Sequence, residues 1–149
     1  MQHGTTPGPS SRHFVQKSWG YEDWIVNSPL YCGKQLFIEK DKGCRWHYHK
    51  EKDETFFVSS GTIILWTALR GTNPEEVYQH ILRTNEHTRI PPGLPHRFWG
   101  VEDSCIIEFS TEHKDEDSIR LCEGEWEIRM IEDQYTKFGD LKVPGDFCG

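Results

Sequence analysis

The sequence predicts an all-β fold, either a sandwich or a barrel, in one domain. From Trp19 to Thr111 the chain consists of short runs rich in aromatic and β-branched residues, separated by turns. Its 149 residues match the length of one domain. The clearest strand patterns are Tyr31–Glu39, Cys44–His49, Glu54–Ser59, Thr62–Leu69, Val77–Arg83, His96–Trp99 and Ser104–Ser110.

Turn sequences separate these runs in chain order. Lys42-Gly43 follows the first run, and Ser60-Gly61 separates the third run from the fourth. Gly71-Thr72-Asn73-Pro74 precedes the fifth run, and Pro91-Pro92-Gly93 precedes the sixth. Glycine, proline, asparagine and aspartate favour turns, so each sequence is expected to reverse the chain between strands.

The two ends of the chain differ from this central region. Residues 1–13 contain several Gly, Pro and Ser residues and few apolar ones, so we expect a flexible leader. We expect the β domain to cover 14–111, and an acidic segment and C-terminal tail, 112–149, to pack on it. Seven acidic residues against two basic ones lie in 112–127. Residues 125–135 are expected to form a short helix or to be irregular.

The composition excludes several classes of protein. The formal net charge is −7, which argues against broad binding of nucleic acid or of anionic membranes. No run approaches the roughly 20 apolar residues of a spanning helix, and Met1 to His13 lacks the apolar core of a signal peptide. We therefore expect a cytoplasmic protein. Its five cysteines contain no C-x-x-C pair and are interpreted as reduced structural thiols.

His47-Tyr48-His49 and the nearby Glu54 form the motif that most clearly indicates chemistry. Residues i and i+2 of a strand share a face, so both imidazoles can point at one ion. Glu54 begins the next expected strand, and a hairpin would bring its carboxylate beside them. His96, after a rigid Pro- and Gly-rich turn, is a fourth candidate ligand. Divalent metals accept such a set of nitrogen and oxygen donors.

The spacing of these residues resembles the two motifs of the cupin superfamily. His47, His49, Glu54 and Gly61 match H-x-H-x4-E-x6-G, and Pro91, Gly93 and His96 match P-x-G-x2-H. The sequence departs from the family where Asp41 replaces a common glycine and where Gly100 stands in place of a common asparagine. Neither position supplies a ligand.

The resemblance covers about Trp19 to Ser110 and implies a double-stranded β-helix, the cupin jelly roll, with a metal ion in its mouth. By family likeness, His47, His49, Glu54 and His96 coordinate one divalent ion of Mn, Fe, Co, Ni or Zn. Four protein ligands on a six-coordinate ion leave two positions for a substrate that chelates through neighbouring oxygens. Zinc would leave less room.

Flanking residues narrow the resemblance to type II mannose-6-phosphate isomerase-like cupins. The segments 19–27 and 31–34 are similar to the entry region of that group, and 92–97 and 106–110 also match it. Relatives with other functions share these features. An aldose–ketose isomerase needs a metal to hold two adjacent oxygens and a base to move a proton between carbons.

Four further residues are candidates for catalysis or substrate binding. Glu108 interrupts an apolar run and is the expected proton-transfer base, although an exposed position on the wet face of a strand is an equal alternative. Lys34 and Arg120 are expected to hold an anionic or hydroxyl-rich substrate, unless they are ordinary surface charges. Arg45 shares strand parity with His47 and is a candidate substrate contact.

The preferred hypothesis from sequence is a metal-dependent sugar or sugar-phosphate isomerase or epimerase. An iron-dependent dioxygenase acting on a small polar molecule is one alternative, because the same ligands leave room for substrate and dioxygen. A non-catalytic sugar-binding protein is another. The resemblance also implies a homodimer, and no nucleic-acid or membrane partner is expected.

Overall fold

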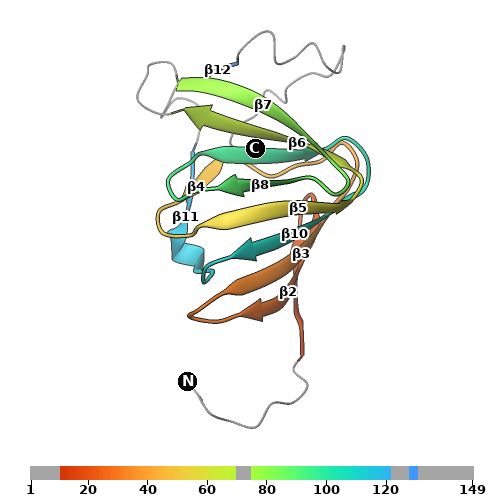
Figure 1. The fold of residues 1–149 in the computed structure, drawn as a ribbon, viewed down its shortest axis with the longest axis vertical. Helices are drawn as coiled ribbons and strands as arrows, with labels where there is room; N and C mark the ends of the chain where they lie inside the picture. The colour runs from red at the N-terminus through yellow and green to blue at the C-terminus, as the bar shows by residue number, and fades with distance from the viewer. Residues whose placement is uncertain (1–10, 70–74, 122–127, 131–149) are drawn as a thin grey trace.

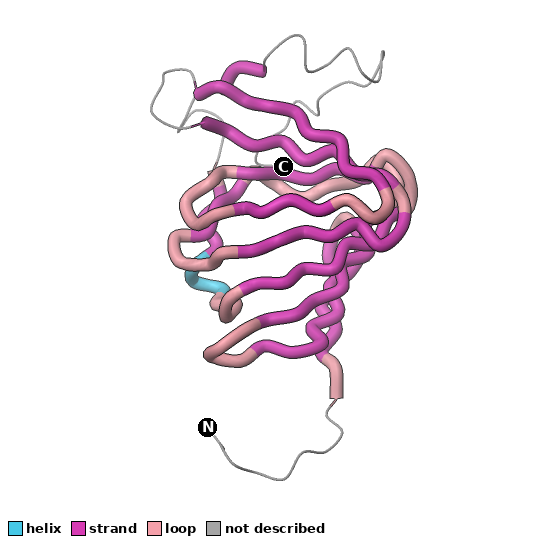
Figure 2. The backbone as a smooth tube through the Cα atoms, viewed as in Figure 1, coloured by secondary structure: helices cyan, strands magenta, loops and turns pink. Residues whose placement is uncertain are grey.

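The computed structural model of the chain describes residues 11–69, 75–121 and 128–130. Within these ranges the regular secondary structure is almost entirely strand, arranged in two six-stranded sheets, as Figures 1 and 2 show. The first sheet has the order β1-β2-β3-β10-β5-β8, and the second has the order β11-β4-β9-β6-β7-β12. All neighbouring pairs are antiparallel except β12 with β7. This arrangement is the jelly roll that the motifs imply.

The strands of the first sheet are β1 (His13–Lys17), β2 (Gly20–Asn27), β3 (Cys32–Ile38), β5 (Glu54–Ser60), β8 (His87–Ile90) and β10 (Ser104–Ser110). Those of the second sheet are β4 (His47–His49), β6 (Thr62–Leu69), β7 (Glu75–Arg83), β9 (His96–Gly100), β11 (Ser118–Arg120) and β12 (Ile128–Met130). A single 3-10 turn, η1 (Asp115–Asp117), precedes β11.

The seven strands expected from sequence are confirmed, with small differences at their ends. Strands β3, β5, β6, β9 and β10 lie within one or two residues of their expected bounds. The run expected at 44–49 is shorter, because only His47–His49 forms a strand there. Strand β1 begins at His13, and Arg12 forms an ion pair with Asp23. Residues 1–10 of the expected leader lie outside the described ranges.

The expectation of a short helix or irregular chain at 125–135 is wrong for Ile128–Met130. These residues form β12, which pairs in parallel with the start of β7. A strand at the edge of a sheet carries unpaired backbone N–H and C=O groups, and a neighbouring strand satisfies them. Tertiary pairing therefore decides the conformation. Residues 122–127 and 131–149 lie outside the described ranges.

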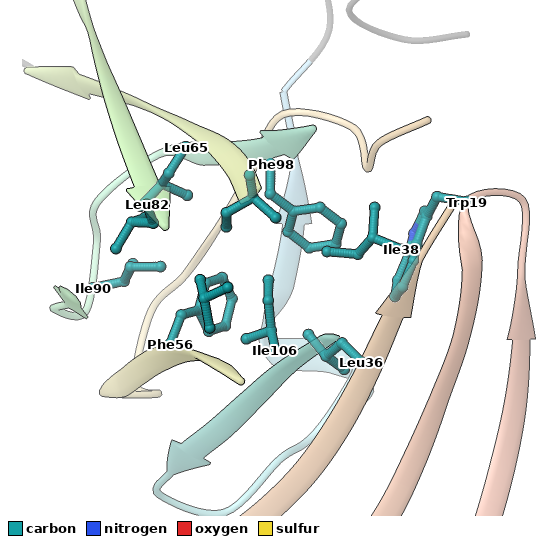
Figure 3. Close-up of a cluster of buried hydrophobic side chains, with 11 residues drawn as sticks. Trp19, Leu36, Ile38, Phe56, Leu65, Leu82, Ile90, Phe98 and Ile106 are labelled. Atoms are coloured by element: carbon teal, nitrogen blue, oxygen red, sulfur yellow. The ribbon is translucent and has the colours of Figure 1, made fainter. Parts of the chain in front are cut away.

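An apolar core fills the space between the sheets, as Figure 3 shows. On each strand the inward residues alternate with outward ones, so the core takes every second residue. Along β3, Leu36 and Ile38 are buried, and along β10, Ile106 is completely buried. The core consists of Trp19, Leu36, Ile38, Phe56, Val58, Ile63, Leu65, Leu82, Ile90, Phe98 and Ile106.

The same inward faces become polar toward one end of the strands. On β3, the next inward-facing residue beyond Leu36 toward this end is Lys34. On β10, the next inward-facing residue beyond Ile106 is Glu108. Register places Glu108 directly opposite Lys34 on the neighbouring strand. On β9 the inward residue before Phe98 is His96. The fold therefore closes one end of the sandwich with apolar side chains and lines the other with charged ones.

No helix among the described residues is long and apolar enough to cross a membrane. Asp41, which stands where cupins usually have glycine, adopts a φ of 62°. Aspartate is one of the few non-glycine residues that enter this left-handed region readily. Asp41 can therefore adopt this turn conformation without a glycine.

Gly61, the last residue of the first motif, provides a test of the turn between β5 and β6. It has a φ of 85°, and a Cβ there would lie 2.6 Å from the carbonyl oxygen of Asp103. We expect Gly61→Ala to lower the free energy of unfolding by about 2–4 kcal/mol, from backbone strain and the clash together. Gly93→Ala is the matched control, because Gly93 has a φ of 83° with open space around it. Urea denaturation should show Gly61→Ala as clearly the more damaging, and equal losses would contradict the steric argument.

Candidate metal centre and its cavity

His47, His49, Glu54 and His96, the four expected ligands, lie together in the structure. One nitrogen from each of the three histidines falls within 4.8 Å of the others. His47 pairs with His96 across β4 and β9, which places their rings 4.3 Å apart. The Glu54 carboxylate reaches the same point, with Oε2 3.2 Å from His49 Nε2 and 3.5 Å from His96 Nε2. The three histidines can therefore hold a metal ion.

Backbone carbonyls set the orientation of two of these imidazoles. His47 Nδ1 lies 2.8 Å from the carbonyl oxygen of Arg45, and His96 Nδ1 lies 2.9 Å from that of Leu94. A carbonyl oxygen can only accept, so each Nδ1 carries the hydrogen and each Nε2 presents its lone pair. This second hydrogen bond is the usual support for a histidine that binds a metal.

The protonation states also fit a cation. Burial lowers the pKa of both His47 and His96 to about 3, so each ring is neutral near pH 7. Glu54 Oε2 and His96 Nε2 are buried and have no hydrogen-bond partner among the described residues. Although Glu54 Oε2 and His49 Nε2 are only 3.2 Å apart, their geometry does not make a hydrogen bond. Leaving a buried polar atom without a partner costs free energy. A divalent ion bound between Glu54 Oε2 and His96 Nε2 would provide a partner for both atoms.

His47, His49 and Glu54 line a cavity of about 1020 Å³ between the two sheets. His96 is completely buried beside them. The cavity is at the upper end of the range for small-molecule sites. Its lining is strongly charged, with both acidic and basic side chains. The charged and histidine residues that line it are His13, Lys17, Glu22, Lys34, Arg45, His47, His49, Lys52, Glu54, Glu108, His113, Asp115 and Arg120.

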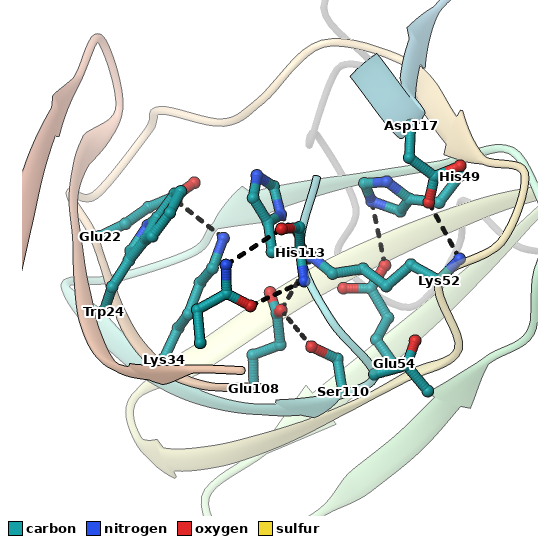
Figure 4. Close-up of polar contacts among 12 residues, drawn as sticks. Glu22, Trp24, Lys34, His49, Lys52, Glu54, Glu108, Ser110, His113 and Asp117 are labelled. Atoms are coloured by element: carbon teal, nitrogen blue, oxygen red, sulfur yellow. Dashed lines mark hydrogen bonds and ion pairs between the residues drawn. The ribbon is translucent and has the colours of Figure 1, made fainter. Parts of the chain in front are cut away.

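Glu108, the expected base, is 4% exposed and lines the cavity, so it does not lie on the wet face of its strand. Its Oε2 lies 2.9 Å from Lys52 Nζ and accepts a hydrogen bond of 2.9 Å from Ser110. Burial alone would raise the pKa of Glu108, but Lys52 and Lys34 lower it to about 2. Burial would likewise lower the pKa of Lys52, but the charge of Glu108 raises it. The two groups form a buried ion pair, as Figure 4 shows.

Lys34 is almost completely buried and lines the same cavity. Its ammonium lies 3.2 Å from Glu22 Oε1 and 4.1 Å from the centre of the Trp24 ring. The Trp24 indole N–H donates to the same Glu22 oxygen at 2.7 Å. Lys34 is therefore not an ordinary surface charge. Its role toward a substrate stays a prediction.

Arg45 and Arg120, the other two expected substrate contacts, are exposed at the cavity wall. Arg120 lies on β11, directly opposite His47 on β4. Each guanidinium can therefore meet a molecule that enters the cavity, although their substrate contacts also stay predictions.

Three residues of the site were not expected from sequence. Lys52 lies in the turn between β4 and β5, and Glu22 lies on β2 in the entry region. His113 follows β10, and its Nδ1 lies 3.0 Å from Lys52 Nζ. The separation of 61 residues between Lys52 and His113 explains why no local pattern predicts their contact. The position of Lys52 between His49 and Glu54, two of the three candidate ligands in the motif, is the one signal in the sequence that points to it.

Asp117 holds the turn that carries Lys52. Its carboxylate accepts hydrogen bonds from the backbone N–H groups of Lys50, Glu51 and Lys52 at 2.8, 2.9 and 3.0 Å. Burial raises its pKa, but these three donors lower it below the ordinary value. Because the turn joins His49 to Glu54, Asp117 fixes the spacing between two candidate ligands.

Asp117→Asn should weaken both the turn and the metal centre. An amide keeps one acceptor oxygen and turns an NH₂ group toward a backbone donor, so we expect a loss of about 1–3 kcal/mol in unfolding free energy. We also expect a divalent ion to bind roughly 10-fold more weakly, the scale of supporting-residue changes. Calorimetric titration measures the second effect. Asp103→Asn, which alters a bond to the Lys40 backbone far from the cavity, serves as a control, and equal metal affinities in all three proteins would contradict the assignment.

Comparisons with known proteins agree with this fold. No family model matches the sequence, and no curated protein matches it either. Among solved structures, the capsular polysaccharide assembling protein CapF from Staphylococcus aureus is 21% identical with a TM-score of 0.64. The alignment covers 76% of this chain and 35% of CapF, so this chain spans about a third of that protein.

Two further neighbours share the fold. KdgF from Halomonas sp. is 13% identical with a TM-score of 0.59, over 72% of this chain and 90% of KdgF. Oxalate decarboxylase from Bacillus subtilis is 16% identical with a TM-score of 0.65, over 80% of this chain and 33% of the decarboxylase. These neighbours are cupins. The likeness shows that this chain has the cupin fold.

Proposed function

We propose that this protein is a metal-dependent isomerase or epimerase of sugars or sugar phosphates. The observation that carries the proposal is the buried Glu108–Lys52 ion pair in the cavity that His47, His49 and Glu54 line, with His96 grouped beside these two histidines. A fold by itself selects no reaction, so the argument depends on these side chains. The specific likeness to type II mannose-6-phosphate isomerases is part of the same proposal.

His47, His49, Glu54 and His96 would hold one divalent ion of Mn, Fe, Co, Ni or Zn. Such an ion supplies Lewis acidity toward the adjacent carbonyl and hydroxyl oxygens of a sugar. Two neutral imidazoles whose Nε2 atoms keep their lone pairs, and a carboxylate oxygen without a hydrogen-bond partner among the described residues, support this assignment. The donor set does not select one metal.

Glu108 would move the proton between the two carbons. Its low pKa keeps the carboxylate ionised near pH 7, the form that accepts a proton. The Lys52 ammonium would donate a hydrogen bond to a substrate oxygen. In doing so it would loosen its hold on Glu108 and make that carboxylate more basic, because the ion pair is what lowers the pKa.

Lys34, Arg45 and Arg120 would orient the rest of the substrate. All three line the cavity, and their charges suit the hydroxyl groups or the phosphate of a sugar. Lys34 acts from the buried wall, whereas the two arginines act from exposed positions.

We also propose that the protein is a homodimer. Phe14, Tyr21 and Phe37 form a row of aromatic contacts across β1, β2 and β3. Phe14 is 63% exposed and Phe109 is 58% exposed. Exposed aromatic groups of this kind are typical of protein interfaces. Sedimentation of the purified protein distinguishes a dimer from a monomer.

A proton NMR screen in deuterated water tests the reaction. Protein loaded with manganese, iron or zinc is incubated with aldoses, ketoses and their phosphates, then removed before spectra are recorded. We expect deuterium at the carbon beside the carbonyl of at least one sugar. Glu54→Ala should abolish it, whereas Glu51→Ala, an exposed change in the same turn, should not.

The other outcomes of the screen are equally informative. No exchange with any sugar or metal contradicts the isomerase and epimerase proposal. Oxygen consumption with iron and none with manganese would then favour the iron-dependent dioxygenase. Tight sugar binding without turnover in any metal form would favour a binding protein.

A further inference from the structure

Consecutive hydrogen bonds join the buried Glu108 carboxylate to the surface of the protein. Glu108 Oε2 lies 2.9 Å from Lys52 Nζ, which lies 3.0 Å from His113 Nδ1. His113 Nε2 then lies 2.9 Å from Asp115 Oδ1. The Lys52 side chain is 2% exposed, whereas that of Asp115 is 91% exposed. The series therefore crosses from the interior to solvent in three steps.

Physical chemistry assigns a direction to each of these bonds. An ammonium group can only donate, so His113 Nδ1 accepts from Lys52. Burial and the charges of Lys34 and Lys52 lower the pKa of His113, which favours the neutral ring. The single ring hydrogen is then on Nε2 and is donated to the Asp115 carboxylate. Both ring nitrogens of His113 are thus hydrogen-bonded.

Other contacts hold the His113 ring in place. Its backbone N–H donates to the side-chain oxygen of Asn27 at 2.8 Å, and its carbonyl accepts from the amide of Asn27 at 3.0 Å. The Trp24 ring packs edge-on against it at 4.8 Å. Figure 4 shows Lys52 reaching between Glu108 and His113. A phenylalanine ring could make the same packing contact with Trp24. The packing therefore does not explain why this ring has two hydrogen-bonded nitrogen atoms.

We propose that His113 and Asp115 form the route by which the Glu108–Lys52 pair exchanges protons with solvent. That the transferred proton comes from a substrate carbon rests on the proposed function. The route itself rests only on the hydrogen bonds between Glu108, Lys52, His113 and Asp115. The proposal adds two residues to the cavity that neither the motifs nor the likeness to cupins assigns.

The transfer conserves protons and charge at each bond. After Glu108 has taken a proton from the substrate carbon, a Lys52 N–H bond breaks as an N–H bond forms at His113 Nδ1, and the His113 Nε2–H proton passes to Asp115 and then to water. The lone pair freed on Lys52 then takes the proton of Glu108, whose new O–H bond breaks. Lys52 is an ammonium before and after. Return of a solvent proton along the same bonds restores the original His113 tautomer and reloads Glu108.

The exchange of the Lys52 ammonium hydrogens with water tests the route without any substrate. Zinc-loaded protein labelled with ¹⁵N at lysine is observed by NMR, as wild type and as His113→Phe and Asp115→Asn. Because the Lys52 side chain is almost completely covered, we expect exchange to slow by about tenfold in both variants. His80→Phe, outside the cavity lining, is the matched control and should leave the rate unchanged.

Unchanged Lys52 exchange in Asp115→Asn overturns the proposal. Asp115 is so exposed that this variant is expected to fold, so it decides the matter even if His113→Phe does not fold. Zinc affinity, measured in parallel, shows whether a variant has simply disturbed the cavity. A variant that exchanges slowly but binds zinc normally supports the route.

Turnover in deuterated water provides the second readout. In the wild type the hydrogen returned to the substrate comes largely from solvent, whereas His113→Phe should return the hydrogen that Glu108 removed. We expect deuterium incorporation per turnover to fall by about tenfold. If the wild type converts no sugar, the proposed function fails, and ammonium exchange still decides the route. If turnover occurs with unchanged incorporation and unchanged exchange, the route fails alone.

Discussion

Replacing Glu54 with Gln is expected to weaken the binding of a divalent ion by at least about 100-fold, because even supporting residues of metal sites contribute 10–100-fold. The side chain keeps its shape but loses the charge that faces His49 and His96 at 3.2 and 3.5 Å. Titration of metal-free protein with Mn²⁺ or Zn²⁺ measures the loss directly. An affinity within a few-fold of the wild type would exclude Glu54 as a ligand.

The same change should remove most of the stabilisation that the metal provides. Free metal at 1,000 times the wild-type Kd would stabilise the wild type by about 4.1 kcal/mol. With a Kd 100-fold weaker, the Gln variant would gain only about 1.4 kcal/mol at that concentration. Unfolding with and without metal measures both values. Glu51→Gln, an exposed change in the same turn, should respond as the wild type does.

Lys52→Met should lower the free energy of unfolding by about 3–5 kcal/mol. The ammonium is the partner of Glu108, and both side chains are at most 5% exposed. Removing it leaves a buried carboxylate whose remaining side-chain hydrogen bond, among the described residues, comes from Ser110. Urea denaturation of metal-free protein isolates this effect from any change in metal binding.

The double variant Lys52→Met/Glu108→Leu is the decisive control. Replacing a whole buried ion pair with apolar groups of similar size is often neutral or stabilising, so most of the lost stability should return. The double variant should nevertheless be inactive in the sugar screen. A double variant as unstable as Lys52→Met would show that the loss comes from packing of the lysine stem and not from the unpaired charge.

The dependence of the free energy of unfolding on pH tests the ion pair independently. The pKa of Glu108 is about 2 in the folded protein, against an ordinary value of 4.5. A carboxyl with a lowered folded pKa contributes stability that is fully present above the unfolded pKa and is lost as the pH falls through the folded pKa. The wild type should therefore lose stability between about pH 4.5 and pH 2. The double variant should lose less over the same range.

The position of Glu108 shows where sequence reasoning stops. In the run Cys105-Ile106-Ile107-Glu108-Phe109, apolar residues occur at both parities, so alternation does not say which side of the strand is buried. Pairing of β10 between β3 and β5 decides it, with Ile106 and Glu108 inward and Phe109 outward. A carboxylate buried on the same inward face as an apolar residue requires a charged or hydrogen-bonding partner. That partner is Lys52, which lies in the turn between β4 and β5.

The strands and the candidate ligands depend on local pattern, and for this reason they could be predicted. The i and i+2 spacing of His47 and His49, the short turn to Glu54 and the rigid turn before His96 each act over a few residues. Strand runs separated by Gly and Pro likewise indicate their own ends. The sequence by itself therefore determined an all-β fold and the set of residues that meet at the candidate metal centre.

Only the tertiary structure decided which charges face one another across the cavity. Lys52 meets Glu108 and His113, and Asp117 binds the turn at 50–52, across 56 to 67 positions of sequence. Pairing of Ile128–Met130 with β7 likewise replaced an expected helical or irregular segment with a strand. Such contacts arise because sheet packing brings distant strands and turns together, and a buried charge is stable only where that packing also supplies its partner.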